Sequence, residues 1–223
     1  MKAKPFSLMS KREALSICGS LSRTSKMPGP SYSLPAESCR LGSLLQYIPK
    51  AVCAHCYALH GRYVFPVVQR AMEKRLASLD HPKWVEAMTA LIRCSGQKHF
   101  RWHDSGDLQS LRHLKNIVAV CRDLPQVKFW LPTREYQTVE AYRRIGGEIP
   151  KNLCIRYSAH LIDGEPPKKY GLPVSTVRRD GNKARGAYRC PALRQENTCG
   201  HCRACWDRRI VTIEFPLKWA GGE

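Results

Sequence analysis

The sequence contains no long apolar run: no stretch of its 223 residues approaches the roughly 18 apolar residues that a membrane helix needs. The first 20 residues, MKAKPFSLMSKREALSICGS, also lack the continuous apolar region and the cleavage site of a secretory signal. These absences argue against a membrane protein and against a secreted one. We therefore expect a soluble, cytoplasmic protein without a membrane partner.

Acidic residues are scarce as well: 18 Asp and Glu stand against 37 Lys and Arg, which gives a formal net charge of +19. An excess of this size favours contact with polyanions, and nucleic acid is the first candidate partner. Internal repeats and low-complexity tracts are absent, while 43% hydrophobic and 25% charged residues are ordinary globular usage. Disordered, collagen-like and coiled-coil classes are thereby excluded.

Short apolar runs alternate with helical patterns along most of the chain. Strands are expected near residues 31–34, 99–102, 127–132, 153–159, 174–177 and 210–215. This alternation predicts an α/β fold, an open or partial (β/α) barrel of about six mostly parallel strands, because a complete eight-stranded barrel takes about 250 residues. One helix is expected to begin with Asp80 as its cap and Pro82 in its first turn. We expect a basic, partly ordered segment over 1–26 and a single α/β domain over 27–223.

Eleven cysteines are the strongest chemical signal, and their odd number without a secretory signal argues against a disulfide framework. Cys190, Cys199, Cys202 and Cys205 form a C-x8-C-x2-C-x2-C pattern. Three cysteines at two-residue intervals can bind three irons of a cubane, and the outlying cysteine supplies the fourth ligand, so the segment predicts a [4Fe–4S] iron–sulfur cluster. Zinc is the alternative, although structural zinc sites more often have two separated C-x2-C pairs.

A second group consists of Cys39, Cys53 and Cys56. Three thiolates leave one position open, either for a ligand or substrate on a cluster or for a metal ligand from elsewhere in the chain. The group lies between the first expected strand and the first expected helix, where radical S-adenosylmethionine enzymes carry their cluster loop. In those enzymes the three cysteines are spaced by three and two residues, so Cys39 is too distant, and the spacing does not support S-adenosylmethionine as a cofactor.

Polar residues gather where the expected strands end. His103, Asp104 and Asp107 follow the strand at 99–102, and Arg134 follows the next one. Because the carboxyl ends of parallel strands share one edge, we expect these four residues to form a catalytic site beside Cys39, Cys53 and Cys56. Two alternatives remain open: Asp107 as the cap of the following helix, and Arg134 as half of a structural ion pair.

Several motifs together resemble one known family. SLPAESCRLGS, AVCAHCYALHGRYVFPVV, FRWHDSGDLQS, FWLPTREY, NLCIRYSA and CGHCRACWD occur in order from about Lys26 to Phe215. They are similar to the motifs of the phage and prophage gene product 88 family. The resemblance implies an iron–sulfur protein with radical-enzyme-like character, in the cytoplasm of the host cell, and it includes the seven cysteines of both groups together with His103, Asp104 and Asp107. It implies no particular reaction.

Two functions fit these observations. The first is an iron–sulfur cluster-binding phage-type protein, a redox or radical-type enzyme served by an electron donor, with its site at the strand ends. The second is a zinc-stabilised nucleic-acid-binding protein without catalysis. The basic run VRRDGNKARGAYR at 177–189, near the aromatic side chains of Tyr188 and Trp206, favours the second function.

Overall fold

The computed structural model of the protein describes residues 9–165 and 171–217. Their strands form one seven-stranded sheet in the order β1-β2-β3-β4-β5-β7-β6, and every neighbouring pair is parallel. In these two ranges the outer strands β1 and β6 do not pair with each other, so the sheet is not closed. The strands are β1 (Ser31–Tyr32), β2 (His99–Trp102), β3 (Lys128–Thr133), β4 (Leu153–Ser158), β5 (Val174–Arg178), β6 (Tyr188–Arg189) and β7 (Thr212–Pro216).

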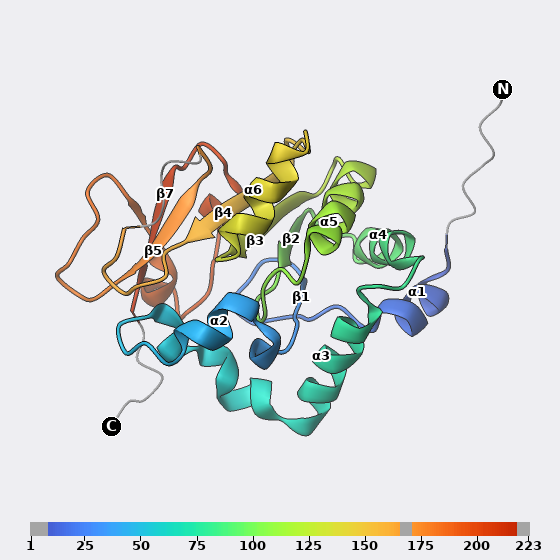
Figure 1. Cartoon of the computed structure of the whole chain (residues 1–223), viewed down its shortest axis with the longest axis horizontal. Helices are drawn as coiled ribbons and strands as arrows, with labels where there is room; N and C mark the ends of the chain where they lie inside the picture. Colours follow the sequence, from blue (N-terminus) through green and yellow to red (C-terminus); the bar gives the residue numbers. More distant parts are fainter. Residues whose placement is uncertain (1–8, 166–170, 218–223) are drawn as a thin grey trace.

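A layer of helices covers one face of the sheet (Figure 1). Within it, α1 packs on α4, α4 on α5, and α5 on α6. From β1 to β5 the strand order follows the chain, and right-handed crossovers that always advance in one direction place their helices on the same side. The helices are α1 (Lys11–Cys18), α2 (Arg40–Leu45), α3 (Pro66–Ser78), α4 (Trp84–Cys94), α5 (Leu111–Asp123) and α6 (Tyr136–Arg144).

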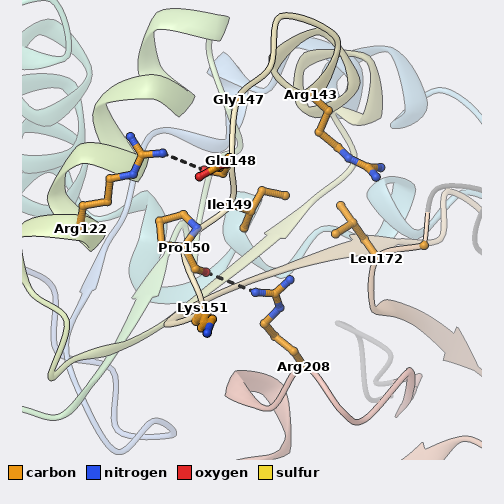
Figure 2. A pocket seen from close by; sticks show the side chains of 10 residues that line it. Arg122, Arg143, Gly147, Glu148, Ile149, Pro150, Lys151, Leu172 and Arg208 are labelled. Atoms are coloured by element: carbon orange, nitrogen blue, oxygen red, sulfur yellow. Dashed lines mark hydrogen bonds between the residues drawn. The ribbon is translucent and has the colours of Figure 1, made fainter.

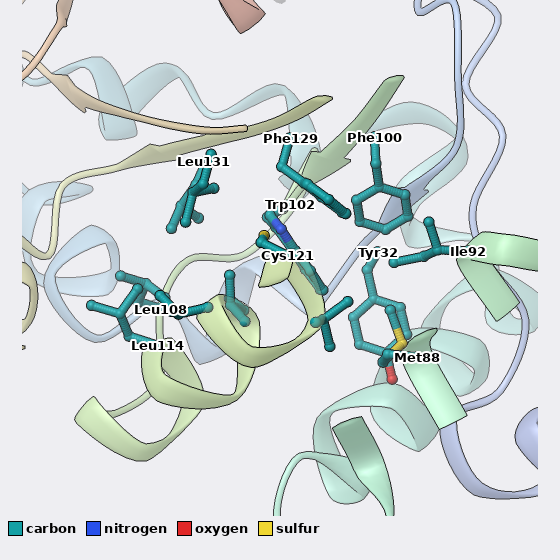
Figure 3. Packing of buried hydrophobic residues seen from close by; sticks show 14 of the residues in the cluster. Tyr32, Met88, Ile92, Phe100, Trp102, Leu108, Leu114, Cys121, Phe129 and Leu131 are labelled. Carbon is teal, nitrogen blue, oxygen red and sulfur yellow. The ribbon is translucent and has the colours of Figure 1, made fainter. Parts of the chain in front are cut away.

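The main core lies between this helix layer and the sheet. Phe100 and Trp102 of β2 and Phe129 of β3 are fully buried in it, and Figure 3 shows their side chains beside α5. Burying one such side chain stabilises the fold by about 1.5–3 kcal/mol. Successive side chains of a strand alternate between faces, so Arg101 and Trp130 lie on the opposite face of the sheet.

The C-terminal segment covers that opposite face. Trp206, which ends the short 3₁₀ helix η7 (Ala204–Trp206), is buried, and its Nε1 donates to the Phe100 carbonyl at 2.8 Å. Its ring lies 5.4 Å from the rings of both Trp130 and His99. The cysteine-rich segment is therefore part of the packed fold rather than an appendage.

The α/β class and the parallel strands are confirmed, but two details differ from expectation. Strand β6 was not expected, because two residues are too few to show a periodicity. The expected helix start at Asp80 is wrong, since α4 begins at Trp84. The backbone carbonyl and Nδ1 of His81 accept the amide hydrogens of Trp84 and Lys83, and this turn delays the helix.

The expected partly ordered segment 1–26 contains a helix that joins the core. Ser10 caps α1 by accepting from the Glu13 amide, and Ala14 and Cys18 are fully buried. Residues 1–8 of that segment lie outside the described residues. Among the helices that are described, none has both the length and the apolar character needed to span a membrane.

Candidate functional site

Cys39 follows β1 and occupies the position that begins α2. Loops after two other strands hold this turn in place. Leu41 N donates to Glu135 Oε1 at 2.8 Å, and Gln109 Nε2 donates to the Ser38 carbonyl at 3.1 Å. Glu135 follows β3 and Gln109 follows β2, so Cys39 lies at the carboxyl end of the parallel sheet, where such sheets collect ligands.

Cys53 and Cys56 lie on the connection between α2 and α3, in the 3₁₀ helix η2 (Val52–His55) and just after it. Val52 N donates to the His160 carbonyl at 2.9 Å. Since His160 follows β4, this loop is docked on the carboxyl end of a further strand. Three strand ends therefore contribute to the placement of the three cysteines.

The three thiols converge into one group, called here the N-terminal cysteine group. A Cβ atom at Gly42 would lie 3.5 Å from Cys39 Sγ, 3.6 Å from Cys53 Sγ and only 2.8 Å from Cys39 Cβ, so a glycine is needed between the two thiols. Burial raises the pKa of the Cys39 thiol, and the charges of Asp107, Cys56 and Cys53 raise it further. Crowded thiols of this kind ionise together only beside a compensating cation.

Asp107 is buried beside this group and ties together two strand ends. Its Oδ1 accepts from Thr133 Oγ1 at 2.6 Å and from the Leu108 amide at 2.7 Å, and its Oδ2 accepts from the Arg134 amide at 2.8 Å. Burial raises the pKa of Asp107 to about 6, against these three hydrogen bonds, which favour the carboxylate. The alternative role as a helix cap is wrong, because Ser110 caps α5.

Arg134 directs its charge toward the same cysteines. Burial raises the pKa values of Cys39 and Cys53, and the positive charge of Arg134 lowers them. Its Nε donates to the Ala159 carbonyl at 3.3 Å. Within residues 9–165 and 171–217 its terminal nitrogens make no hydrogen bond and its guanidinium forms no ion pair, so the alternative of a structural pair is not met there.

Asp104 anchors the loop that carries Cys56. Its Oδ1 accepts from Ser33 Oγ at 2.7 Å and its Oδ2 accepts from the Tyr63 hydroxyl at 2.9 Å. The Tyr57 hydroxyl donates to the Asp104 backbone carbonyl. With both carboxylate oxygens engaged, buried Asp104 fixes the position of the residues next to Cys56.

His103 is buried on the helix side of the fold. Its backbone has the left-handed φ of 57°, and its ring lies 5.1 Å from the ring of His113 and 6.3 Å from that of Trp102. The structure thus brings Asp107 and Arg134 to the N-terminal cysteine group, and it places Asp104 in a loop anchor and His103 beside the core.

Cys190, Cys199, Cys202 and Cys205 also come together, and they are called here the C-terminal cysteine group. Burial raises the pKa of Cys205 to about 12, and the charges of Cys190 and Cys199 add to this effect. Cys202 N donates to the Cys199 carbonyl at 2.8 Å, and Cys202 Sγ lies 3.4 Å from the Tyr188 hydroxyl.

Arg101 lies between the two cysteine groups. Its guanidinium stacks over Trp130 at 4.4 Å, and its Nη2 donates to the Tyr57 hydroxyl at 3.5 Å, directly after Cys56. Its positive charge also acts on Cys205, whose pKa it lowers against the effect of burial. Sequence reasoning missed Arg101, because strand alternation marks it only as a residue that points away from the core.

All eleven cysteines are free thiols. Among the residues that the structure describes, no group of three or more His, Cys, Asp or Glu side chains has an arrangement that could hold a metal ion. The donors of both cysteine groups are nevertheless thiol sulfurs, and the thiolate is the ligand that iron–sulfur clusters and zinc share.

A cavity of about 540 Å³ lies at the other end of the sheet, where the chain enters β4 and β5. Figure 2 shows the guanidinium groups of Arg122 and Arg208, which donate to the backbone carbonyls of Glu148 and Pro150. Four cationic side chains line this cavity: Arg122, Arg143, Lys151 and Arg208. It is far richer in positive than in negative charge.

The fold and the site define a class of protein: an open, parallel α/β protein whose strand-end loops gather thiols, a buried carboxylate and an arginine. The family model of gene product 88 matches residues 8–208, so the chain belongs to the phage gene product 88 family, as its motifs predicted. No curated protein and no solved structure matches the chain.

Proposed function

We propose that the protein binds iron–sulfur clusters, with a [4Fe–4S] cluster on the C-terminal cysteine group. The observation that carries this proposal is that seven free thiols from distant loops gather in two groups, one at the carboxyl end of the sheet and one in the C-terminal segment, with Arg101 between them. The C-x8-C-x2-C-x2-C spacing supports a cluster more directly than it supports zinc. Free thiols in this number also suit a reducing cytoplasm.

The N-terminal cysteine group is proposed to bind a second centre with one coordination position left open. Asp107 and Arg134 lie beside its thiols, and they are the residues best placed to contact a substrate there. Arg134 has terminal nitrogens available for an anionic group, and Asp107 has a pKa near 6, which suits a group that holds or releases a proton. Asp104 is assigned to positioning the loop.

The activity proposed for this site is of the redox or radical type. A bound cluster supplies one-electron chemistry, and the protein supplies placement and electrostatics. An electron donor is therefore the expected partner. S-adenosylmethionine is not included, because Cys39 is too distant in sequence from Cys53 for the compact three-cysteine loop that binds it.

We also propose that the sheet is curved into a partial barrel. The sequential strand order from β1 to β5 and the helix layer on one face support this shape. In a barrel of this kind the carboxyl ends of the strands surround a shared opening. The N-terminal cysteine group would lie in that opening.

Anaerobically purified protein, expressed with ample iron, is expected to be brown and to contain iron and acid-labile sulfide. Replacing Cys199 or Cys202 with serine should remove the colour and the iron of the C-terminal cluster, because a closed ligand set cannot lose a thiolate without loss of metal. Cys94→Ser is the matched control, since Cys94 is exposed at the end of α4 and belongs to neither group. Iron, sulfide and zinc analysis measures the outcome.

A colourless protein with about one zinc per chain would contradict the iron–sulfur assignment and leave zinc as the metal. Equal loss of iron in Cys94→Ser and Cys199→Ser would contradict the ligand assignment. Loss of iron in Cys199→Ser and Cys202→Ser, with iron retained in Cys94→Ser, supports the ligand assignment.

Nucleic-acid binding is a second candidate function, favoured by the cationic cavity at the entry to β4 and β5. The basic run that the sequence suggested is a poorer surface than expected. Arg178 is buried and paired with Glu165, Arg179 pairs with Asp163, and Trp206 is packed in the fold. The exposed cations around the cavity therefore replace that run in the proposal.

If the cavity binds phosphates, the protein should bind single-stranded DNA at low salt, and affinity should fall steeply as salt rises. A triple alanine variant of Arg122, Lys151 and Arg208 should reduce the salt slope by about 2, at about 0.7 per phosphate contact. Fluorescence anisotropy against salt concentration measures the slope. The control is a triple alanine variant of three ion-paired surface cations, Lys83, Arg112 and Arg209. Absence of binding at low salt, or an equal change of the salt slope in the control variant, would contradict phosphate binding at the cavity.

A further inference from the structure

Arg156 is a fully buried cation at the centre of the sheet. It lies in β4, on the face covered by the C-terminal segment rather than on the helix side. Tyr157 and Ile155, its neighbours in the strand, point into the main core, so Arg156 points the other way.

The guanidinium of Arg156 is surrounded by neutral acceptors. Within the described parts of the chain it forms no ion pair, and its Nε has no hydrogen-bond partner. Its Nη1 and Nη2 donate to the carbonyls of Val174 and Ile210 at 3.0 Å, Asp207 at 3.2 Å, and Ala204 and Val211 at 3.4 Å, and Nη2 also contacts Cys154 Sγ at 3.8 Å.

A buried charge without an opposite charge is costly, and neutral carbonyl dipoles compensate it only in part. The acidic partner that such an arginine usually has is missing from the described contacts. One contacted residue, Asp207, is acidic, but its carboxylate pairs with Arg209 and only its backbone carbonyl accepts from Arg156. The other ionisable groups beside these contacts are the thiols of Cys154 and of Cys205, which lies between Ala204 and Asp207. Burial raises the pKa of Cys205, whereas the charge of Arg156 is the largest influence that lowers it.

We propose that Arg156 is the fixed counter-ion of the C-terminal cysteine group and sets the reduction potential of the cluster held there. This inference rests on the proposed iron–sulfur function. A cluster with four thiolate ligands is anionic and becomes more negative when it takes one electron from a low-potential donor. A nearby buried cation stabilises the reduced state more than the oxidised state, and so raises the potential.

The test compares Arg156→Met and Arg156→Lys with the wild-type protein, all purified anaerobically. Arg209→Gln is the matched control, because Arg209 is an exposed arginine of the same segment that pairs with Asp207. Iron content, circular dichroism and the midpoint potential from a dye-mediated titration with dithionite are measured. Arg156→Met should shift the reduced-to-oxidised ratio at a fixed potential at least tenfold toward the oxidised cluster, which is 59 mV for a one-electron couple.

Arg156→Lys keeps the positive charge. It should therefore retain iron and have the same midpoint potential as wild type and Arg209→Gln. A folded, iron-containing Arg156→Met protein with an unchanged potential overturns the inference. If Arg156→Met does not fold, the lysine variant decides. Failure of Arg156→Lys to fold, or a midpoint potential about 59 mV or more below that of wild type, overturns the inference, because the carbonyl contacts and not the charge then matter. Wild-type protein without iron overturns the proposed function, and the counter-ion inference with it.

Discussion

Replacing Asp107 with alanine is expected to lower the free energy of unfolding by about 3–5 kcal/mol. The change leaves three buried donors without an acceptor: the Leu108 amide, the Thr133 hydroxyl and the Arg134 amide. Each such donor costs about 1–3 kcal/mol when it loses its partner inside the protein. Because these donors belong to two different strand ends, the loss also loosens the edge of the sheet beside the N-terminal cysteine group. Urea unfolding followed by tryptophan fluorescence measures the effect.

Asp107→Asn provides a graded comparison, because the amide keeps one acceptor oxygen and turns an NH₂ group toward a donor. It should fall between wild type and Asp107→Ala. The control is Asp180→Ala, since the side chain of Asp180 is 92% exposed and forms a surface pair with Arg189, so a change under about 0.5 kcal/mol is expected. A loss of only about 1 kcal/mol in Asp107→Ala, the value of a simple helix cap, would refute the role as a tie between strands.

The protein is expected to lose stability as the pH falls from about 6.5 to about 4, and His103 is expected to account for about 3 kcal/mol of that loss. Burial lowers the pKa of His103 to about 4, and its two ring nitrogens have no hydrogen-bond partner among the described residues. Burial likewise lowers the pKa of His113, 5.1 Å away, where the charge of His103 adds to the effect. The folded protein therefore keeps both rings neutral at a pH at which the unfolded chain protonates them.

The direction of this pH dependence follows from the difference in proton binding between the folded and unfolded states. Above pH 6.5 both states are neutral at His103 and the contribution to stability is complete. Between pH 6.5 and about pH 4 only the unfolded state gains the proton, so the free energy of unfolding decreases as the pH is lowered. Below about pH 4 both states are protonated at His103 and the loss levels off. The contribution of Asp107 to stability has the opposite sign between pH 3.8 and about 6, because its raised pKa makes the folded state bind more protons than the unfolded state. The charges of Asp104 and Arg101 also act on the pKa of His103.

Comparison with a His103→Asn variant isolates the histidine, because the other groups are common to both proteins and asparagine tolerates the left-handed backbone at this position. The difference in unfolding free energy between wild type and variant should change by about 3 kcal/mol across the window. His81→Gln, at an exposed histidine, should leave the pH profile unchanged. A constant difference between wild type and His103→Asn from pH 7 to pH 4 would contradict a depressed pKa.

Local patterns in the sequence were sufficient to predict the parallel α/β fold. Alternation in HFRW and the short apolar run in KFWLP mark strands, and Leu114, Ile117, Val118 and Cys121 recur at helical spacing in α5. These periodicities depend on neighbours a few residues apart, so they can be read without a structure. The cysteine spacings are local as well, which is why both groups could be recognised and why the family motifs could be matched.

The sequence by itself therefore determined the order of the elements, the two cysteine groups and the expectation that Asp107 and Arg134 lie near the first of them. Only the tertiary structure decided that Asp107 ties β2 to β3 instead of capping α5, that His103 is buried beside His113, and that Arg101 and Arg156 lie next to the thiols. The physical reason is that burial and hydrogen-bond partners depend on contacts between residues far apart in the chain. No local pattern encodes which loop supplies the acceptor for a buried donor, or which thiol lies beside a buried cation.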